Sequence, residues 1–147
     1  MIKRYSLLLC ALSVLSGCIL AHPIASVQDS GITESGRKGT LDQTVKGFNT
    51  ALFWENYSLA NGYATETKVE DIRAELKRQK EGGRIVESKI ENVTFHDDAY
   101  KAEVDVTLKV QDFGTNTVQP KEEKQSWTFS VYDGWKLEGI KREQSDT

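Results

Sequence analysis

Residues 100–111 have the sequence YKAEVDVTLKVQ, which is the most regular pattern in the chain. From Tyr100 to Val110, every apolar side chain is followed by a polar one. Successive side chains of a β-strand point to opposite faces, so this alternation predicts a strand with one buried face and one solvated face. Such half-buried strands are typical of antiparallel sheets, and the stretch therefore predicts an antiparallel sheet.

Further strand signals lie on both sides of this stretch. Residues 85–95 are rich in branched and aromatic side chains, and 96–99 (HDDA) predict the turn that joins the two strands. Residues 112–120 predict the next connection, and a third strand follows in which Trp127, Phe129 and Val131 are expected to alternate inward. Asp133 and Gly134 predict a tight hairpin turn before a last strand that carries Trp135, Leu137 and Ile140. The pattern predicts a meander of about four strands.

Helices are predicted before the sheet. Apolar residues recur at three- and four-residue spacing from Leu41 to Ala64, which indicates one long or broken amphipathic helix with Thr40 as its N-cap. A second helix is expected from Val69 to Lys80, ending at the paired glycines 82–83, and its charged run is interpreted as a solvated face. The predicted fold class is α+β, with N-terminal helices packed on a curved antiparallel sheet of about four strands.

The order of these elements resembles a known family. Helices followed by a meander that ends in DGWKL, residues 133–137, are similar to the nuclear transport factor 2-like, cystatin-like cone fold, over about residues 41–142. The resemblance implies a cone or roll whose wide end can hold a cavity. Its enzymes, the SnoaL-like cyclases and ketosteroid isomerases, keep an aspartate or histidine inside the cone. Here Glu103 and Asp105 fall on the polar phase of their strand, so no catalytic residue is expected.

The first residues predict the cellular location of the protein. Lys3 and Arg4 precede an apolar run from Leu7 to Leu15, which is the layout of a secretory signal and is too short for a spanning helix. Residues 15–18 (LSGC) resemble the lipobox of bacterial lipoproteins, which implies cleavage between Gly17 and Cys18 and lipidation of Cys18. The alternative is an ordinary signal cleaved after Ala21 or Ala25.

The expected organisation is a signal peptide at 1–17, a flexible tether at 18–39, the folded domain at 40–143 and a tail at 144–147. The tether is expected to be flexible because it is poor in large apolar residues. By the same resemblance, the absence of Asp after the cysteine favours the outer membrane, on its periplasmic side, over the inner membrane. Removing the signal leaves 17 basic and 22 acidic side chains, a formal net charge of −5, which argues against nucleic acid as a partner.

Aromatic side chains supply the candidate binding residues. A pocket or partner surface is predicted from Trp54, Tyr57, Tyr63, Trp127, Phe129 and Trp135, although core packing explains most such residues in a small domain. His96, Asp97 and Asp98 form the sole local group of acid-base or ligand side chains in the sequence and are interpreted as a solvated turn. No metal site and no cofactor is expected.

Three functions remain open at this point. The first is a non-enzymatic, membrane-anchored domain that binds another envelope protein. The second is a module that binds a small apolar ligand within the cone. The third and weakest is an isomerase or hydrolase of the SnoaL-like type.

Overall fold

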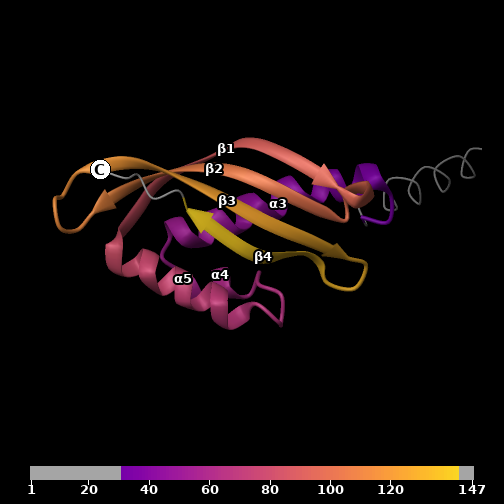
Figure 1. Cartoon of the computed structure of the whole chain (residues 1–147), viewed down its shortest axis with the longest axis horizontal. Helices are drawn as coiled ribbons and strands as arrows, with labels where there is room; N and C mark the ends of the chain where they lie inside the picture. Colours follow the sequence, from indigo (N-terminus) through magenta and orange to yellow (C-terminus); the bar gives the residue numbers. More distant parts are fainter. Residues whose placement is uncertain (1–30, 143–147) are drawn as a thin grey trace, which may run out of the picture.

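The computed structural model describes residues 31–142, which form three helices, a short 3-10 helix and one sheet (Figure 1). The predicted signal peptide, the cleavage and lipidation positions Gly17 and Cys18, and the predicted C-terminal tail lie outside these residues. Among the described helices, none is both long and apolar enough to span a membrane. The elements follow one another along the chain as α3 (Glu34–Phe53), α4 (Tyr57–Asn61), α5 (Val69–Gly82), β1 (Gly83–His96), η1 (Asp97–Ala99), β2 (Lys101–Asp112), β3 (Val118–Ser130) and β4 (Gly134–Arg142).

The sheet is an antiparallel meander with the strand order β1-β2-β3-β4. This confirms the predicted meander of four strands, and β2 agrees with the alternating stretch to within one residue. β3 begins at Val118, within residues 112–120, so the predicted connection is too long. Side chains on one phase of β2, from Ala102 to Val110, are buried, and those on the other phase are exposed or half-buried. Two register shifts interrupt the pairing of β1 with β2, so the edge strand β1 is irregular. Bulges of this kind are a common way to protect an exposed sheet edge.

The first helix begins earlier than the sequence predicts. Its N-cap is Thr33, whose hydroxyl oxygen accepts a hydrogen bond from the backbone N–H of Gly36 at 3.0 Å. Residues 34–39, assigned to the flexible tether, are therefore helical, and the prediction of Thr40 as N-cap is wrong. The hydroxyl of Thr40 instead donates to the carbonyl oxygen of Gly36 inside the helix, at 3.1 Å.

The amphipathic stretch 41–64 is a broken helix, which is one of the two forms that the sequence predicts. Glu55 adopts a positive φ of 56° between α3 and α4. Asn56 then caps α4, because its side-chain oxygen accepts a hydrogen bond from the N–H of Leu59 at 3.1 Å. At the end of α5, a Cβ on Gly83 would lie 2.5 Å from the carbonyl oxygen of Gln111, so only glycine fits this close approach to β2.

One hydrophobic core lies between the helices and the inner face of the sheet. Phe48 of α3 and Trp127 of β3 are almost fully buried there, and their rings meet edge to face with centroids 5.8 Å apart. α4 contributes little to it, with Ala60 as its one buried residue, and α5 contributes Ile72 and Leu76. The sheet and α3 therefore supply most of the core.

The predicted fold class is wrong. The sheet is the dominant part of the molecule, with strands of 14, 12, 13 and 9 residues. The helices do not form an N-terminal layer over a curved cystatin-like cone: α3 lies along the sheet, while α4 and α5 lie to one side of it (Figure 1). The physical reason is that α4 has only five residues and buries only Ala60, while α5 buries three side chains, so these helices cannot serve as the predicted cover.

Candidate functional site

An open groove of about 480 Å³ lies where α3, α4 and the β3–β4 hairpin meet, and we call it the hairpin groove. Its helical wall consists of Thr40 and Thr44 of α3 together with Leu59, Gly62 and Tyr63 of α4 and its end. Its opposite wall comes from the hairpin and consists of Phe129, Val131, Asp133, Gly134, Trp135 and Lys136. The volume falls within the range of small-molecule pockets.

The hairpin that forms this wall ends in a short, hydrogen-bonded loop. Ser130 and Gly134 are the last paired residues, and Gly134 has a φ of 70°, a left-handed conformation that glycine adopts without strain. The backbone N–H of Asp133 donates to the hydroxyl oxygen of Ser130 at 2.9 Å, and that hydroxyl donates to the carboxylate of Asp133 at 3.0 Å. These bonds close the short loop between the two strands.

The tip presents apolar side chains to solvent. Tyr132 is 97% exposed and Val131 is 62% exposed, and Leu59 on the facing helix is also exposed. The prediction that Val131 points inward is therefore wrong, because β3 ends at Ser130 and the strand alternation stops there. Exposed apolar side chains beside a groove are a common feature of interaction sites.

The structure brings together three of the six predicted binding residues. Tyr63, Phe129 and Trp135 line the hairpin groove, and the rings of Phe129 and Trp135 lie 5.5 Å apart in an edge-to-face pair. Phe129 and Trp135 are 8% and 4% exposed and also belong to the core, so they line only the base of the groove. Trp127 is a core residue that does not reach the groove, with 1% of its surface exposed.

The other two lie elsewhere. Tyr57 lines a separate groove between α4 and α5. Trp54 is 69% exposed beyond the end of α3, where it stacks edge to face on Phe53. These two residues therefore do not belong to the hairpin groove.

Arg37, which the sequence analysis did not single out, ties the hairpin end of the molecule together. Its guanidinium donates to the carbonyl oxygens of Ile32 at 2.8 Å and of Asp98 at 2.7 Å, and it lies 4.0 Å from the centre of the Tyr100 ring. The indole N–H of Trp135 donates to the carbonyl oxygen of Arg37 at 2.8 Å. One buried arginine thus connects the start of α3 with η1 and with a wall of the groove.

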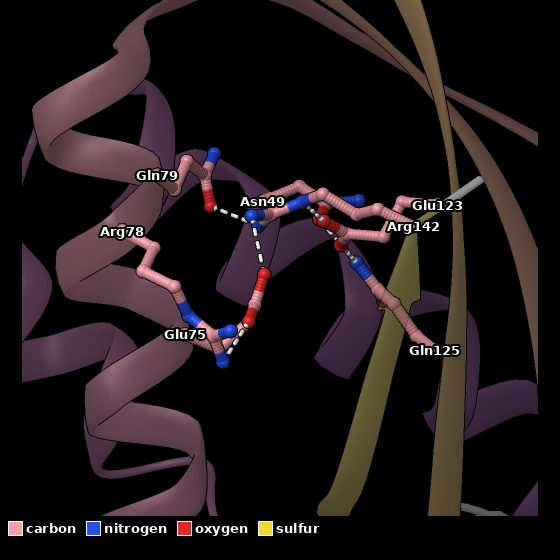
Figure 2. A network of polar contacts seen from close by, with 7 residues as sticks. All are labelled: Asn49, Glu75, Arg78, Gln79, Glu123, Gln125 and Arg142. Carbon is pink, nitrogen blue, oxygen red and sulfur yellow. Dashed lines mark hydrogen bonds and ion pairs between the residues drawn. The ribbon is translucent and has the colours of Figure 1, made fainter. Parts of the chain in front are cut away.

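A buried polar cluster occupies the other end of the core, and we call it the Arg142 cluster (Figure 2). The guanidinium of Arg142 donates through Nε to Glu123 at 2.9 Å, through one terminal nitrogen to Glu75 at 2.6 Å and through the other to Gln79 at 2.6 Å. Because Glu75 and Gln79 belong to α5, these bonds fasten α5 to β3 and β4. The interpretation of the whole charged run of α5 as a solvated face is therefore wrong for these two residues.

The cluster extends from Glu123 to the first helix. The side-chain N–H of Gln125 donates to Asn49 of α3 at 3.0 Å and to Glu123 at 2.8 Å, and the indole N–H of Trp127 donates to the oxygen of Gln125 at 3.3 Å. Glu123 is 2% exposed and Gln125 is fully buried. A carboxylate held by an arginine and a glutamine is already satisfied, so the arrangement supports packing of α3, α5 and the sheet and does not provide a free base.

The remaining acid-base candidates lie on the surface. Glu103 and Asp105 point away from the core, as predicted, and share Lys124 at 3.9 and 3.6 Å. His96, Asp97 and Asp98 lie at the predicted turn, where Asp97 pairs with Lys101 at 3.0 Å. Within residues 31–142, no group of three His, Cys, Asp or Glu side chains is placed to hold a metal ion.

Comparison with known proteins gives a fold and no family. No protein-family model matches the chain, and no curated protein matches its sequence. Among solved structures, a SEC-C motif containing protein from Rhodopseudomonas palustris is similar with a TM-score of 0.53 at 8% identity, covering 65% of this chain and 73% of that chain. The chain shares the fold of that protein, which replaces the predicted cystatin-like cone.

A second structure is similar at a lower level. The intermembrane space region of the chloroplast protein ARC6 has a TM-score of 0.40 at 13% identity, and the match covers 82% of this chain and 88% of that region.

Proposed function

We propose that the protein is a non-enzymatic, lipid-anchored binding protein of the bacterial cell envelope, and that the hairpin groove and its tip bind another envelope protein. The observation that carries this proposal is the exposure of Val131 and Tyr132 at a hydrogen-bonded hairpin beside the hairpin groove. Tyrosine is enriched where binding energy concentrates in protein interfaces. Hydrogen bonds within the tip reduce the conformational freedom that it loses on binding, which favours affinity.

The position of the tip also supports the proposal. The described chain begins at Gly31, and a Cβ on Gly31 would lie 2.6 Å from the ring of Phe129, so the start of the described chain lies against the base of the hairpin. Figure 1 shows the start of α3 and the β3–β4 hairpin at the same end of the molecule. A lipid on Cys18 would hold this end within reach of a membrane, since Cys18 precedes Gly31 by 13 residues, which span at most about 45 Å.

The anchor is tested by mass spectrometry of the mature N-terminus. The proposal expects a chain that starts at Cys18 and carries acyl chains, in the outer-membrane fraction of a bacterial cell. An ordinary secretory signal cleaved after Ala21 or Ala25 would instead give a chain that starts at His22 or Ser26 and carries no lipid. Detection of either unacylated chain as the mature form would contradict the proposal.

The partner surface is tested by affinity capture of the full chain from detergent-solubilised membranes. The variant Val131→Ser/Tyr132→Ser removes the apolar tip, whereas the matched control Phe113→Ser/Val118→Ser removes another exposed apolar pair, from the β2–β3 end of the sheet. We expect a discrete partner with the wild-type chain and with the control, and its loss with the tip variant. Capture that is the same for all three chains, or no partner above background, would contradict the proposal.

A second function has a specific observation in its favour. The walls of the hairpin groove include Phe129 and Trp135, and its volume is large enough for a small apolar ligand. Such a ligand would bind to the purified chain in the absence of any other protein. Quenching of tryptophan fluorescence by an apolar dye, lost in Leu59→Ser, would favour this function over a protein partner.

A further inference from the structure

A second groove, of about 420 Å³, lies between α4 and α5, and we call it the basic groove. Tyr57, Ser58 and Asn61 form its α4 side. Figure 1 shows the two helices next to each other on one side of the sheet. The groove is separate from the hairpin groove, so an inference about it does not rest on the proposed function.

The α5 side of this groove is strongly positive. Arg73, Lys77 and Lys80 line it together with Leu76, and no carboxylate is among its lining residues. The three cations follow a spacing of four and three residues, which places them on one face of a helix. This concentration of positive charge runs against the acidic balance of the chain, whose formal net charge is −3.

The cations are only partly neutralised by neighbouring side chains. Arg73 pairs with Glu70 at 2.6 Å, but Lys77 lies 3.9 Å from Glu81. Within residues 31–142, the ammonium of Lys80 has no carboxylate within 4.0 Å and lies 5.6 Å from the centre of the Tyr57 ring. Lys80 therefore has no carboxylate partner among these residues, and Lys77 has only a long contact with Glu81.

The opposite wall offers groups that recognise hydroxyls. The side-chain oxygen of Asn61 is buried and accepts no hydrogen bond within the described part of the chain. Buried acceptors of this kind nearly always have a hydrogen-bond donor, so a donor is expected for this oxygen as well. Ser58 adds a hydroxyl, and Tyr57 adds a ring face next to it. Burial raises the pKa of Tyr57 above its usual value, so its phenol stays neutral and able to donate.

We propose that the basic groove binds a phosphate ester that also carries hydroxyl groups, of the class of sugar and glycerol phosphates. Lys77 and Lys80 bind the phosphate, since lysine acts as a point charge for such groups. Asn61 accepts a hydrogen bond from a ligand hydroxyl, and Tyr57 packs against the carbon skeleton. The ligand is either a soluble phosphate ester or the headgroup of a phospholipid, which share this chemistry.

The test uses the full chain in a neutral detergent and follows the backbone amides of α4 and α5 by NMR. Glycerol 3-phosphate is the probe, with glycerol and inorganic phosphate as references. We expect saturable shifts with glycerol 3-phosphate, at least tenfold weaker binding of inorganic phosphate, and none of glycerol. Equal affinity for glycerol 3-phosphate and inorganic phosphate would overturn the proposal, as would the absence of a saturable shift with both glycerol 3-phosphate and a phospholipid headgroup.

Matched variants separate the groove from general charge effects. Lys77→Gln/Lys80→Gln should weaken binding of glycerol 3-phosphate at least tenfold, whereas Lys89→Gln/Lys109→Gln, which removes the same charge from β1 and β2, should leave it unchanged. Asn61→Leu should reduce the affinity for glycerol 3-phosphate to that for inorganic phosphate. Equal weakening by both lysine pairs would overturn the proposal, because it would show that net charge alone attracts the anion.

The source of the ligand is decided by the same amide signals in nanodiscs. Nanodiscs of phosphatidylcholine with and without phosphatidylglycerol present the headgroup in a bilayer. Shifts that appear with phosphatidylglycerol and are lost in Lys77→Gln/Lys80→Gln assign the groove to a headgroup. Shifts with soluble glycerol 3-phosphate alone assign it to a free phosphate ester, and shifts with neither would overturn the proposal.

Discussion

The two halves of the inner face of β3 are built from different chemistry. Near the hairpin, Trp127 and Phe129 are buried among aromatic rings, while toward the start of the strand Glu123 and Gln125 are buried in the Arg142 cluster. The aromatic half packs mainly through edge-to-face contacts between rings and ends in an exposed apolar tip. The polar half is held by hydrogen bonds and ion pairs, so each of its polar groups needs a partner at a fixed distance. The polar half holds α3 and α5 on the sheet, and the aromatic half leads to the end at which we propose the binding site.

The largest expected effect comes from the aromatic half. Trp127→Ala removes a ring that contacts both Phe48 and Tyr63 and leaves a cavity in the core. We expect the free energy of unfolding to fall by about 3–5 kcal/mol, the usual cost of such a truncation. Urea unfolding monitored by circular dichroism measures this change, and a loss below about 1 kcal/mol would show that the core does not depend on this ring.

The next largest effect is expected from a substitution that disrupts the polar half. Arg142→Met leaves the carboxylate of Glu123 buried without its positive partner, which should lower the free energy of unfolding by about 3 kcal/mol.

A double variant serves as the control for the polar half. Arg142→Met/Glu123→Gln removes both charges of the buried pair and should recover part of the stability lost in Arg142→Met, as measured by the same unfolding experiment. A double variant that is less stable than Arg142→Met would contradict the assignment of Glu123 as the group left unpaired.

A smaller effect is expected where the described chain enters the aromatic half. Gly31 has a φ of 71°, and a Cβ there would lie 2.6 Å from the ring of Phe129. Gly31→Ala therefore combines a disfavoured backbone conformation with displacement of the ring, and we expect a loss of about 1–2 kcal/mol. Gly39→Ala, where an added Cβ meets nothing within 4 Å, is the control and should be neutral or slightly stabilising.

The smallest effect concerns a carboxylate on the surface, in contrast to the buried Glu123. The backbone N–H groups of Thr115 and Gly114 donate to Asp112, and these bonds lower the pKa of its carboxyl below its usual value. A lowered pKa stabilises the folded state above the unfolded-state pKa, and this stability is lost as the pH falls through the folded-state value. The difference in Tm between wild type and Asp112→Asn should therefore shrink between about pH 5 and pH 2. A constant difference would contradict this role.

The sequence predicts those elements whose signals are local. The alternation of residues 100–111 locates β2 because the two-residue period depends only on neighbouring side chains. The alternation of β3, continued past Ser130, wrongly predicts that Val131 points inward, since nothing in the pattern marks the end of the strand. Thr33 was missed as N-cap because the apolar stripe begins only at Leu41, although Thr33 has the hydroxyl that a cap requires.

The buried polar residues could be predicted only in part. Gln125 and Glu123 lie two and four residues before Trp127, so the strand alternation itself predicts that they point to the inner face. Their partner Arg142 could not be assigned, because the pairing of β3 with β4 contains a register shift between Ser126 and Trp127. The fold class failed for a similar reason: the order of helices and strands was predicted correctly, but their order does not determine how the helices cover the sheet.

The central claim is that the aromatic end of the molecule is its binding end, and site-specific photocrosslinking in intact cells tests it most directly. A photoreactive amino acid at Tyr132 should give a discrete crosslinked product. The same amino acid at Phe113, an exposed aromatic position at the opposite end of the sheet, should give none. The same products from both positions, or none from Tyr132, would contradict the claim.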